Sequence, residues 1–122
     1  MGIGGVRMLT FNLKKEWFEK IKSGEKTHEY RECKPYWRKR IVSHKGLFLH
    51  INNLCFASVT EEGIFTDNLN LDCEFVCGYA KKDDKEKRLK AKVKKISIVN
   101  GKNTDLAIEE LVYDIEFELL ED

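Results

Sequence analysis

Alternating and helical patterns of apolar residues follow one another along the chain and predict a mixed α+β fold. Apolar residues at every second position predict strands, whereas apolar residues three or four positions apart predict helices. Residues 8–13 alternate and predict a first strand, and residues 14–23 carry Trp, Phe and Ile at helical spacing. Gly24 follows where glycine commonly ends a helix, and Asn12 is placed to cap its start. The chain is therefore predicted to begin with a strand and an amphipathic helix.

Most of the remaining chain predicts further short strands. The predicted strands cover residues 25–32, 47–51, 73–80, 89–98 and 115–119. The alternation shifts by one residue within the long fourth segment, which predicts a bulge near Lys94 and Lys95. Pro35 opens a second short helix that ends at Ile41, and residues 105–112 fit one or two helical turns. Five to six strands, an N-terminal helix and one or two further short helices predict a small, partly open β-barrel with helices on its outside.

The length and composition fit one soluble domain. The chain has 122 residues, which corresponds to a single domain spanning 1–122. Its 42% hydrophobic and 11% aromatic residues support a packed core and exclude a disordered chain. No apolar run approaches the roughly 20 residues of a membrane span, and residues 1–13 lack the pattern of a secretory signal. We therefore expect a cytoplasmic protein without a membrane partner.

The net charge of +1 hides a strong alternation along the chain. Residues 1–50 carry 12 Lys and Arg against 5 acids, and residues 81–102 carry 10 against 3. The segments that follow these blocks, 51–80 and 103–122, contain acids but no Lys or Arg. If the two basic blocks fold together, they form a polarised face suited to an anionic partner; otherwise they are the solvated faces of strands and helices.

The spacing of cysteine and histidine gives no support for a metal site or a cofactor. The four cysteines form no Cys-x-x-Cys pair, and in a reducing compartment we expect free thiols in the core. His28, His44 and His50 have no partner at the spacing of a metal site or a catalytic triad. We interpret His50, on the predicted strand 47–51, as a satisfied core or cleft histidine, and we expect no metal and no cofactor.

The segment 23–31, Ser-Gly-Glu-Lys-Thr-His-Glu-Tyr-Arg, carries the densest candidate chemistry. A strand that starts directly after the glycine turn would place Thr27, Glu29 and Arg31 on one face. Alternation directs Lys26 to the other face, unless the turn releases it toward the same cleft. A carboxylate and a guanidinium on one face can form a structural ion pair, or the guanidinium can hold a phosphate or a base edge.

The same segment resembles the signature of the ASCH domain family, which belongs to the PUA-like superfamily. The family pattern Gly-x-Lys-x-x-Glu-x-Arg is matched by Gly24, Lys26, Glu29 and Arg31. The helix pattern of residues 13–21 and the strand pattern of residues 113–119 are also similar to that family. The resemblance therefore covers both ends of the chain.

This resemblance implies a small PUA-like β-barrel with a ligand cleft beside the motif. The ligand would be RNA or a nucleotide-like small molecule, and Lys26, Glu29 and Arg31 would line the cleft. The residues themselves leave a structural Glu29–Arg31 ion pair as the alternative. The resemblance also implies an alternative function, because some members of the family hydrolyse N4-acetylcytidine or RNA.

If the chain is such a hydrolase, its candidate catalytic residues are Lys26, Glu29 and Thr27. In the hydrolase branch of the family, a Lys acts with a Thr three residues later and with a carboxylate from elsewhere in the chain. Here the position three residues after Lys26 is Glu29, so Glu29 would have to activate Thr27 or a water molecule. Lys26 would stabilise an oxyanion. Because the hydroxyl is displaced from its place in that branch, we expect little or no hydrolysis of N4-acetylcytidine.

The predicted second helix interleaves aromatic and basic residues. Tyr36, Arg38 and Arg40 form a combination typical of single-stranded nucleic-acid binding, because rings stack on bases and cations neutralise phosphates. Trp37 and Ile41, four positions apart, instead fit the anchoring of this helix to the barrel. We therefore add Tyr36, Arg38 and Arg40 to the candidate ligand-binding residues.

Overall fold

The structure is a computed structural model that describes residues 9–43, 63–66 and 70–120. Its elements in chain order are β1 (Leu9–Leu13), α1 (Lys15–Lys22), β2 (His28–Glu32), α2 (Pro35–Ser43), β3 (Gly63–Thr66), β4 (Leu71–Cys77), η1 (Lys85–Lys87), β5 (Arg88–Asn100), η2 (Gly101–Asn103) and β6 (Leu111–Leu119). The predicted α+β class, the N-terminal helix and the second short helix are confirmed, whereas the predicted strand 47–51 lies outside the described residues. The helices in the described part of the chain are too short and too polar to cross a membrane.

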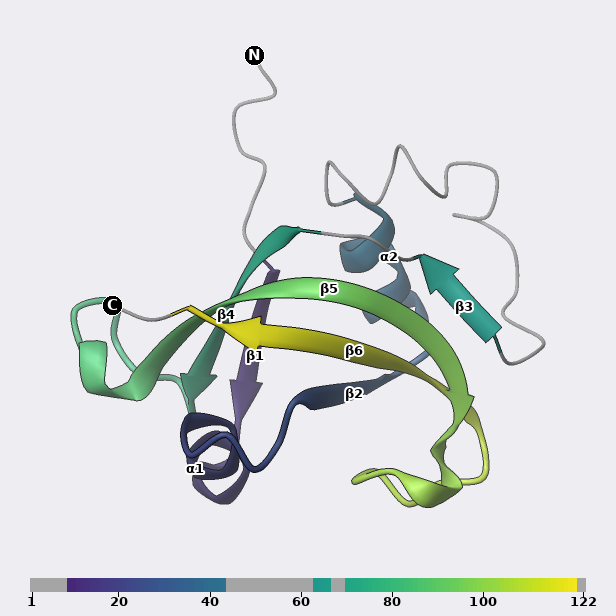
Figure 1. The fold of residues 1–122 in the computed structure, drawn as a ribbon, viewed down its shortest axis with the longest axis horizontal. Helices are drawn as coiled ribbons and strands as arrows, with labels where there is room; N and C mark the ends of the chain where they lie inside the picture. Colours follow the sequence, from purple (N-terminus) through teal and green to yellow (C-terminus); the bar gives the residue numbers. More distant parts are fainter. Residues whose placement is uncertain (1–8, 44–62, 67–69, 121–122) are drawn as a thin grey trace, which may run out of the picture.

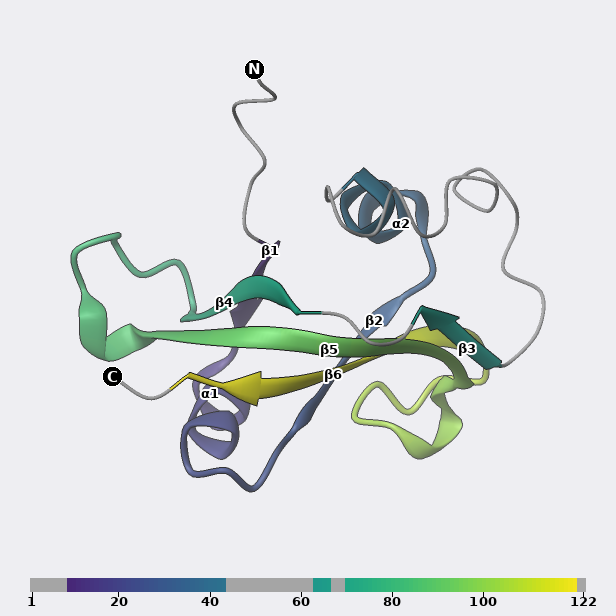
Figure 2. The same ribbon diagram turned by 45° about the horizontal axis from the view of Figure 1, so that its top comes forward.

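The six described strands form one curled sheet (Figures 1 and 2). Its hydrogen-bonded order is β1-β4-β5-β6-β2, and β3 pairs with β5. β1 and β4 are parallel, and the other pairs are antiparallel. The register of β5 on β6 shifts between Val93 and Lys95, which confirms the predicted bulge. The sheet forms a half-barrel, and we call the gap between its outer strands β1 and β2 the seam.

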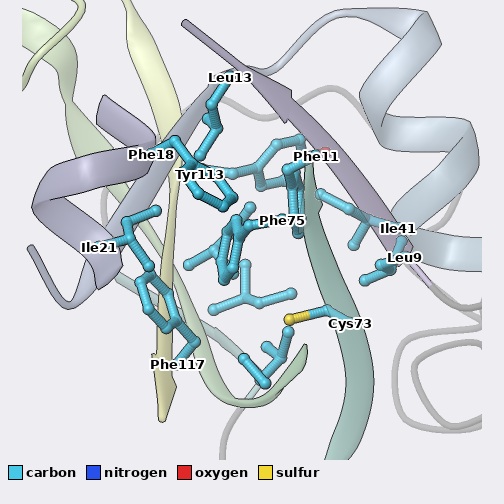
Figure 3. Packing of buried hydrophobic residues seen from close by; sticks show 14 of the residues in the cluster. Leu9, Phe11, Leu13, Phe18, Ile21, Ile41, Cys73, Phe75, Tyr113 and Phe117 are labelled. Carbon is cyan, nitrogen blue, oxygen red and sulfur yellow. The ribbon is translucent and has the colours of Figure 1, made fainter. Parts of the chain in front are cut away.

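One face of the curled sheet holds the hydrophobic core (Figure 3). Residues of β1 are alternately buried and exposed, so Leu9, Phe11 and Leu13 all reach the core. Helix α1 adds Phe18 and Ile21, which are three positions apart and therefore share one side of the helix. Full burial of such a side chain contributes about 1.5–3 kcal/mol, so these two residues hold α1 against β1 and β4.

Helix α2 is anchored by the two residues whose spacing predicts that role. Ile41 is fully buried. The ring of Trp37 stacks on Phe11 of β1, with ring centroids 5.3 Å apart. The anchoring interpretation of Trp37 and Ile41 is therefore confirmed.

Two local predictions are wrong. Asn12 does not cap α1: the helix begins after Lys14, and the Asn12 side chain donates a hydrogen bond to the Gly78 carbonyl oxygen at 2.7 Å. Residues 105–112 form no helix, because the chain there turns back on Gly101 and then enters β6. In both cases a contact with another part of the chain displaces the local preference.

The alternation of charge along the sequence becomes cross-strand pairing in the sheet. Lys92 of β5 forms an ion pair with Asp72 of β4 at 2.5 Å, and Arg88 pairs with Glu74 at 2.7 Å. On the other side of β5, acids of β6 stand opposite its lysines. Helix α2 lies away from the segment 81–87 in both views (Figures 1 and 2). The start of the second basic block, residues 81–87, is therefore remote from α2.

Candidate functional site

The turn between α1 and β2 frees Lys26 from the alternation of the strand. Gly24 adopts a φ of +87°, a conformation that favours glycine, and follows the end of α1 as predicted. The backbone N–H of Lys26 then donates to the Lys20 carbonyl oxygen at 3.0 Å. β2 begins only at His28, so alternation does not direct the Lys26 side chain away from Glu29.

Glu29 lies at the centre of a chain of ionic contacts. One of its carboxylate oxygens lies 3.3 Å from the Lys26 ammonium, and the other accepts a hydrogen bond from Arg31 at 2.6 Å. Lys26 also forms an ion pair with Asp105. The side chains of Lys26 and Glu29 are each only 8% exposed, so their charges are compensated by one another more than by water. The structure brings the three charged motif residues together and adds Asp105 to them.

Two aromatic rings flank the Lys26 ammonium. Its Nζ atom lies 5.5 Å from the ring centroid of Trp17 and 5.0 Å from that of Tyr30. Burial raises the pKa of Tyr30, and nearby carboxylates, chiefly that of Asp114, raise it further. The Tyr30 hydroxyl therefore keeps its proton at neutral pH and remains a hydrogen-bond donor.

A cleft of about 270 Å³ opens beside this cluster. It is lined by Trp17, Lys20, Glu25, Lys26, Thr27, His28, Tyr30 and Asp105. Of the motif residues, Lys26 reaches the cleft and so does its neighbour Thr27, whereas Glu29 lies buried behind Lys26. Arg31 contacts Glu29 on its other carboxylate oxygen and does not line the cleft. The motif therefore contributes to the cleft at one end and to the interior of the fold at the other.

Asp105 reaches the cleft because the loop that carries it closes on itself. The Gly101 N–H donates to the Glu110 carbonyl oxygen at 2.7 Å. The Thr104 hydroxyl donates to the Gly101 carbonyl oxygen at 2.8 Å and accepts the backbone N–H two residues later at 3.2 Å. These bonds on both sides of Asp105 hold the loop in place.

Arg31 spans the seam between the two outer strands. Its Nη2 atom donates to Glu29 and, at 3.2 Å, to the carbonyl oxygen of Asn12 in β1. The guanidinium carbon lies 5.4 Å from the ring centroid of Phe11 and 4.8 Å from that of Trp37. Arg31 Nε is buried without a hydrogen-bond partner among the described residues. These contacts favour a bracing role for the Glu29–Arg31 pair.

The three candidates on α2 do not line the cleft. Tyr36 is 57% exposed, and the guanidinium carbon of Arg40 lies 3.6 Å from the centroid of its ring. Arg38 is partly buried. Its positive charge lowers the pKa of the Cys33 thiol, but burial of the thiol has the larger effect and raises that pKa to about 11. Tyr36 and Arg40 therefore form a stacked pair at the surface, whereas Arg38 is partly covered by the fold.

His28 has a carboxylate partner that its sequence spacing does not reveal. Its Nδ1 atom lies 2.6 Å from Oδ1 of Asp114, a residue 86 positions away. The two side chains meet because β2 and β6 are neighbouring strands. The sequence spacing could not reveal this partner, and His44 and His50 lie outside the described residues.

A larger groove of about 560 Å³ lies at the start of β5. Its lining consists of Glu74, Lys82, Lys85, Arg88, Leu89, Lys90 and Leu120. Arg88 is held by the Glu74 carboxylate and by the carbonyl oxygens of Lys81 and Ala80. This groove contains lysines of the second basic block and none of the predicted site residues.

Among the described residues, no three His, Cys, Asp or Glu side chains lie together in a way that could hold a metal ion. Cys33, Cys73 and Cys77 are free thiols.

No family profile, curated protein or solved structure matches the chain.

Proposed function

We propose that this chain is an ASCH-like domain with a PUA-like barrel, and that its cleft binds a nucleobase. The base belongs either to a free nucleotide or to an unpaired nucleotide of RNA. The observation that carries the proposal is the presence of two rings, Trp17 and Tyr30, and the Asp105 carboxylate in one cleft. Lys26 connects them, because its ammonium contacts both rings and Asp105.

Each part of the cleft matches part of a nucleoside. Aromatic side chains stack on bases, and each such contact contributes about 1–3 kcal/mol. The Asp105 side chain is 34% exposed, and a carboxylate can accept a hydrogen bond from the exocyclic amino group of cytosine. The cleft volume of about 270 Å³ lies near the lower limit of small-molecule sites, which is roughly 300 Å³. It therefore suits one nucleoside rather than several.

The motif residues have different roles in this proposal. Lys26 holds Asp105 in place and adds a positive charge to the cleft, whereas Glu29 and Arg31 support Lys26 from the interior. When the ligand is RNA, Tyr36, Arg38 and Arg40 of α2 contact neighbouring bases and phosphates. A free nucleotide and RNA thus share the contacts of the cleft and differ in those of α2.

Binding is tested by titrating the protein with mononucleotides and short single-stranded RNA while tryptophan fluorescence is recorded, because Trp17 lines the cleft. We expect saturable quenching, and Asp105→Asn should weaken binding about tenfold, since a hydrogen bond to a charged group is lost. The matched control is Asp84→Asn, which alters a carboxylate beside η1 and should bind as the unmodified protein does. Absence of saturable binding by any nucleotide would overturn the proposal.

A hydrolase of an acylated nucleoside is the second candidate, and one observation favours it. Lys26 pairs with Asp105, a carboxylate from elsewhere in the chain, and Thr27 lines the same cleft. Glu29, however, is buried between two cations and is poorly placed to activate Thr27. We therefore expect little or no release of cytidine from N4-acetylcytidine. Robust turnover that disappears in Lys26→Ala would make this hydrolase the leading function.

A further inference from the structure

His28 and Asp114 form a hydrogen-bonded pair across two neighbouring strands. Nδ1 of His28 lies 2.6 Å from Oδ1 of Asp114. The register places Tyr30 opposite Asp114 and His28 opposite Glu116, so His28 and Asp114 are diagonal neighbours on one face of the sheet. Because an ionised carboxylate only accepts hydrogen bonds, Nδ1 of His28 carries the proton of this bond.

Asp114 occupies one ring nitrogen of His28 and thereby leaves Nε2 for a ligand. His28 lines the cleft and its side chain is 36% exposed, whereas that of Asp114 is 18% exposed. The imidazole also stacks on Tyr30, with ring centroids 6.4 Å apart and planes inclined by 14°. A histidine whose Nδ1 is held by a carboxylate and whose side chain lines a cleft has the arrangement of a proton-transfer group.

We propose that the cleft hydrolyses O-acyl esters of nucleosides, with His28 as the catalytic residue that transfers protons and Asp114 as its positioning residue. The choice of a nucleoside as the alcohol part of the ester rests on the proposed binding function. The choice of an acyl ester rests on the dyad, of which His28 lines the cleft, and on Lys26, which lines the same cleft.

In the proposed reaction, Nε2 of His28 takes a proton from a water molecule while the water oxygen attacks the carbonyl carbon of the ester. The π electrons of the carbonyl group move to its oxygen, and the Lys26 ammonium stabilises the resulting oxyanion. When the oxyanion collapses, the C–O bond to the nucleoside breaks and the imidazolium returns its proton to the leaving oxygen. Ester and water become a carboxylic acid and a nucleoside, and no other reactant is needed.

A single histidine favours this reaction over two related ones. Cleavage of a phosphodiester proceeds in line, so the attacking and leaving oxygens lie on opposite sides of phosphorus and call for two proton-transfer groups. A tetrahedral acyl intermediate instead exchanges both protons with one base, as in the serine hydrolases. An amide such as N4-acetylcytidine has a poorer leaving group than an ester, so it remains a poor substrate.

The test is the hydrolysis of 5′-O-acetylcytidine by the full chain, followed as the release of cytidine. We expect saturable turnover, and His28→Gln should lower kcat about 100-fold or more. Asp114→Asn should also lower kcat strongly while KM stays within about twofold, because proton transfer rather than substrate contact is lost. The matched control is Asp72→Asn, which breaks the ion pair with Lys92 in another part of the sheet and should retain the full kcat.

Titration with cytidine separates failure of this inference from failure of the binding function. If cytidine binds but its acetyl ester is not hydrolysed, or if His28→Gln hydrolyses it at the unmodified rate, the inference is wrong and the binding function stands. If no nucleotide binds, both proposals are wrong; if a nucleotide other than that of cytidine binds, the acetyl ester of its nucleoside replaces 5′-O-acetylcytidine in the same test. Thermal unfolding is measured for each variant, and His28→Asn replaces His28→Gln if the latter does not fold.

Discussion

The guanidinium of Arg31 donates a hydrogen bond to the carbonyl oxygen of Asn12 at 3.2 Å and so joins the two outer strands of the half-barrel. Asn12 belongs to β1 and Arg31 to β2, and these two strands do not pair with each other in the sheet. The same guanidinium pairs with Glu29 and lies over the ring of Trp37. A motif residue that is a candidate ligand contact thus also closes the open side of the fold.

Arg31→Ala should therefore destabilise the protein strongly. Among the described residues, the change leaves the buried Glu29 carboxylate with Lys26 as its remaining ion-pair partner. Breaking a buried pair from one side costs about 3–5 kcal/mol, and we expect a loss near the lower end because Lys26 stays in place. Unfolding in urea measures this loss. A loss below about 1 kcal/mol together with weakened nucleotide binding would instead assign Arg31 to the ligand.

The control for Arg31→Ala is Lys34→Ala on the same segment. Lys34 pairs with Glu32 at 3.0 Å, but its side chain is 61% exposed. An ion pair of an exposed lysine contributes little to stability, because water and salt screen it, so this variant should unfold at nearly the same urea concentration as the unmodified protein.

Gly101→Ala should disturb the loop that carries Asp105. A Cβ atom at this position would lie 2.9 Å from the carbonyl oxygen of Ile108 and 2.9 Å from Cγ1 of Val112. A backbone oxygen cannot rotate away as a side-chain end can, so the loop must shift. We expect a loss of about 1–3 kcal/mol in stability and weaker nucleotide binding. Lys102→Ala, at an exposed neighbouring position, is the control, and an unchanged Gly101→Ala protein would contradict the expectation.

The elements with local signals could be predicted from the sequence. The apolar spacing of α1 and the shifted alternation of β5 depend only on neighbouring residues, and both match the structure. The predicted strand 25–32 begins later than expected because the N–H of Lys26 bonds to a carbonyl of α1. Residues 105–112 form no helix because their backbone groups are bonded within the loop that closes on Gly101. Secondary structure predicted from neighbouring residues was therefore wrong where the backbone forms hydrogen bonds to other segments instead.

The candidate site was only partly predictable, because its members come from distant segments. Lys26 and Thr27 follow from the motif, whereas Trp17 was visible only as an apolar position of the predicted helix. Asp105 and Asp114 reach the cleft region through a closed loop and through the pairing of β2 with β6. No pattern of neighbouring residues encodes that pairing.

Stability should decrease as the pH rises above about 9. Burial raises the pKa of Cys33 from 9.0 to about 11 and that of Cys73 from 9.0 to about 12. Both thiols ionise at lower pH in the unfolded chain, so above pH 9 the folded state binds more protons and the free energy of unfolding decreases as pH increases. Urea unfolding between pH 7 and pH 11 measures this dependence. Cys33→Ala should reduce this dependence while Cys73 keeps the remainder, and a midpoint independent of pH would contradict the expectation.

If the ligand is RNA, the arginines of α2 should hold its phosphates. We expect short single-stranded RNA to bind with micromolar affinity that falls steeply with salt, by a slope of about −0.7 for each neutralised phosphate. Reversing the charge of Arg38 and Arg40 to Glu should abolish this binding but leave cytidine binding unchanged, because neither residue lines the cleft. The control reverses Lys82 and Lys85, which makes the same change of charge in the groove at the start of β5. Fluorescence anisotropy of labelled RNA over a salt series measures all three proteins. Either of two results would show that α2 does not hold the strand. One is binding that is independent of salt. The other is binding that survives in the Arg38 and Arg40 variant and is lost in the Lys82 and Lys85 variant.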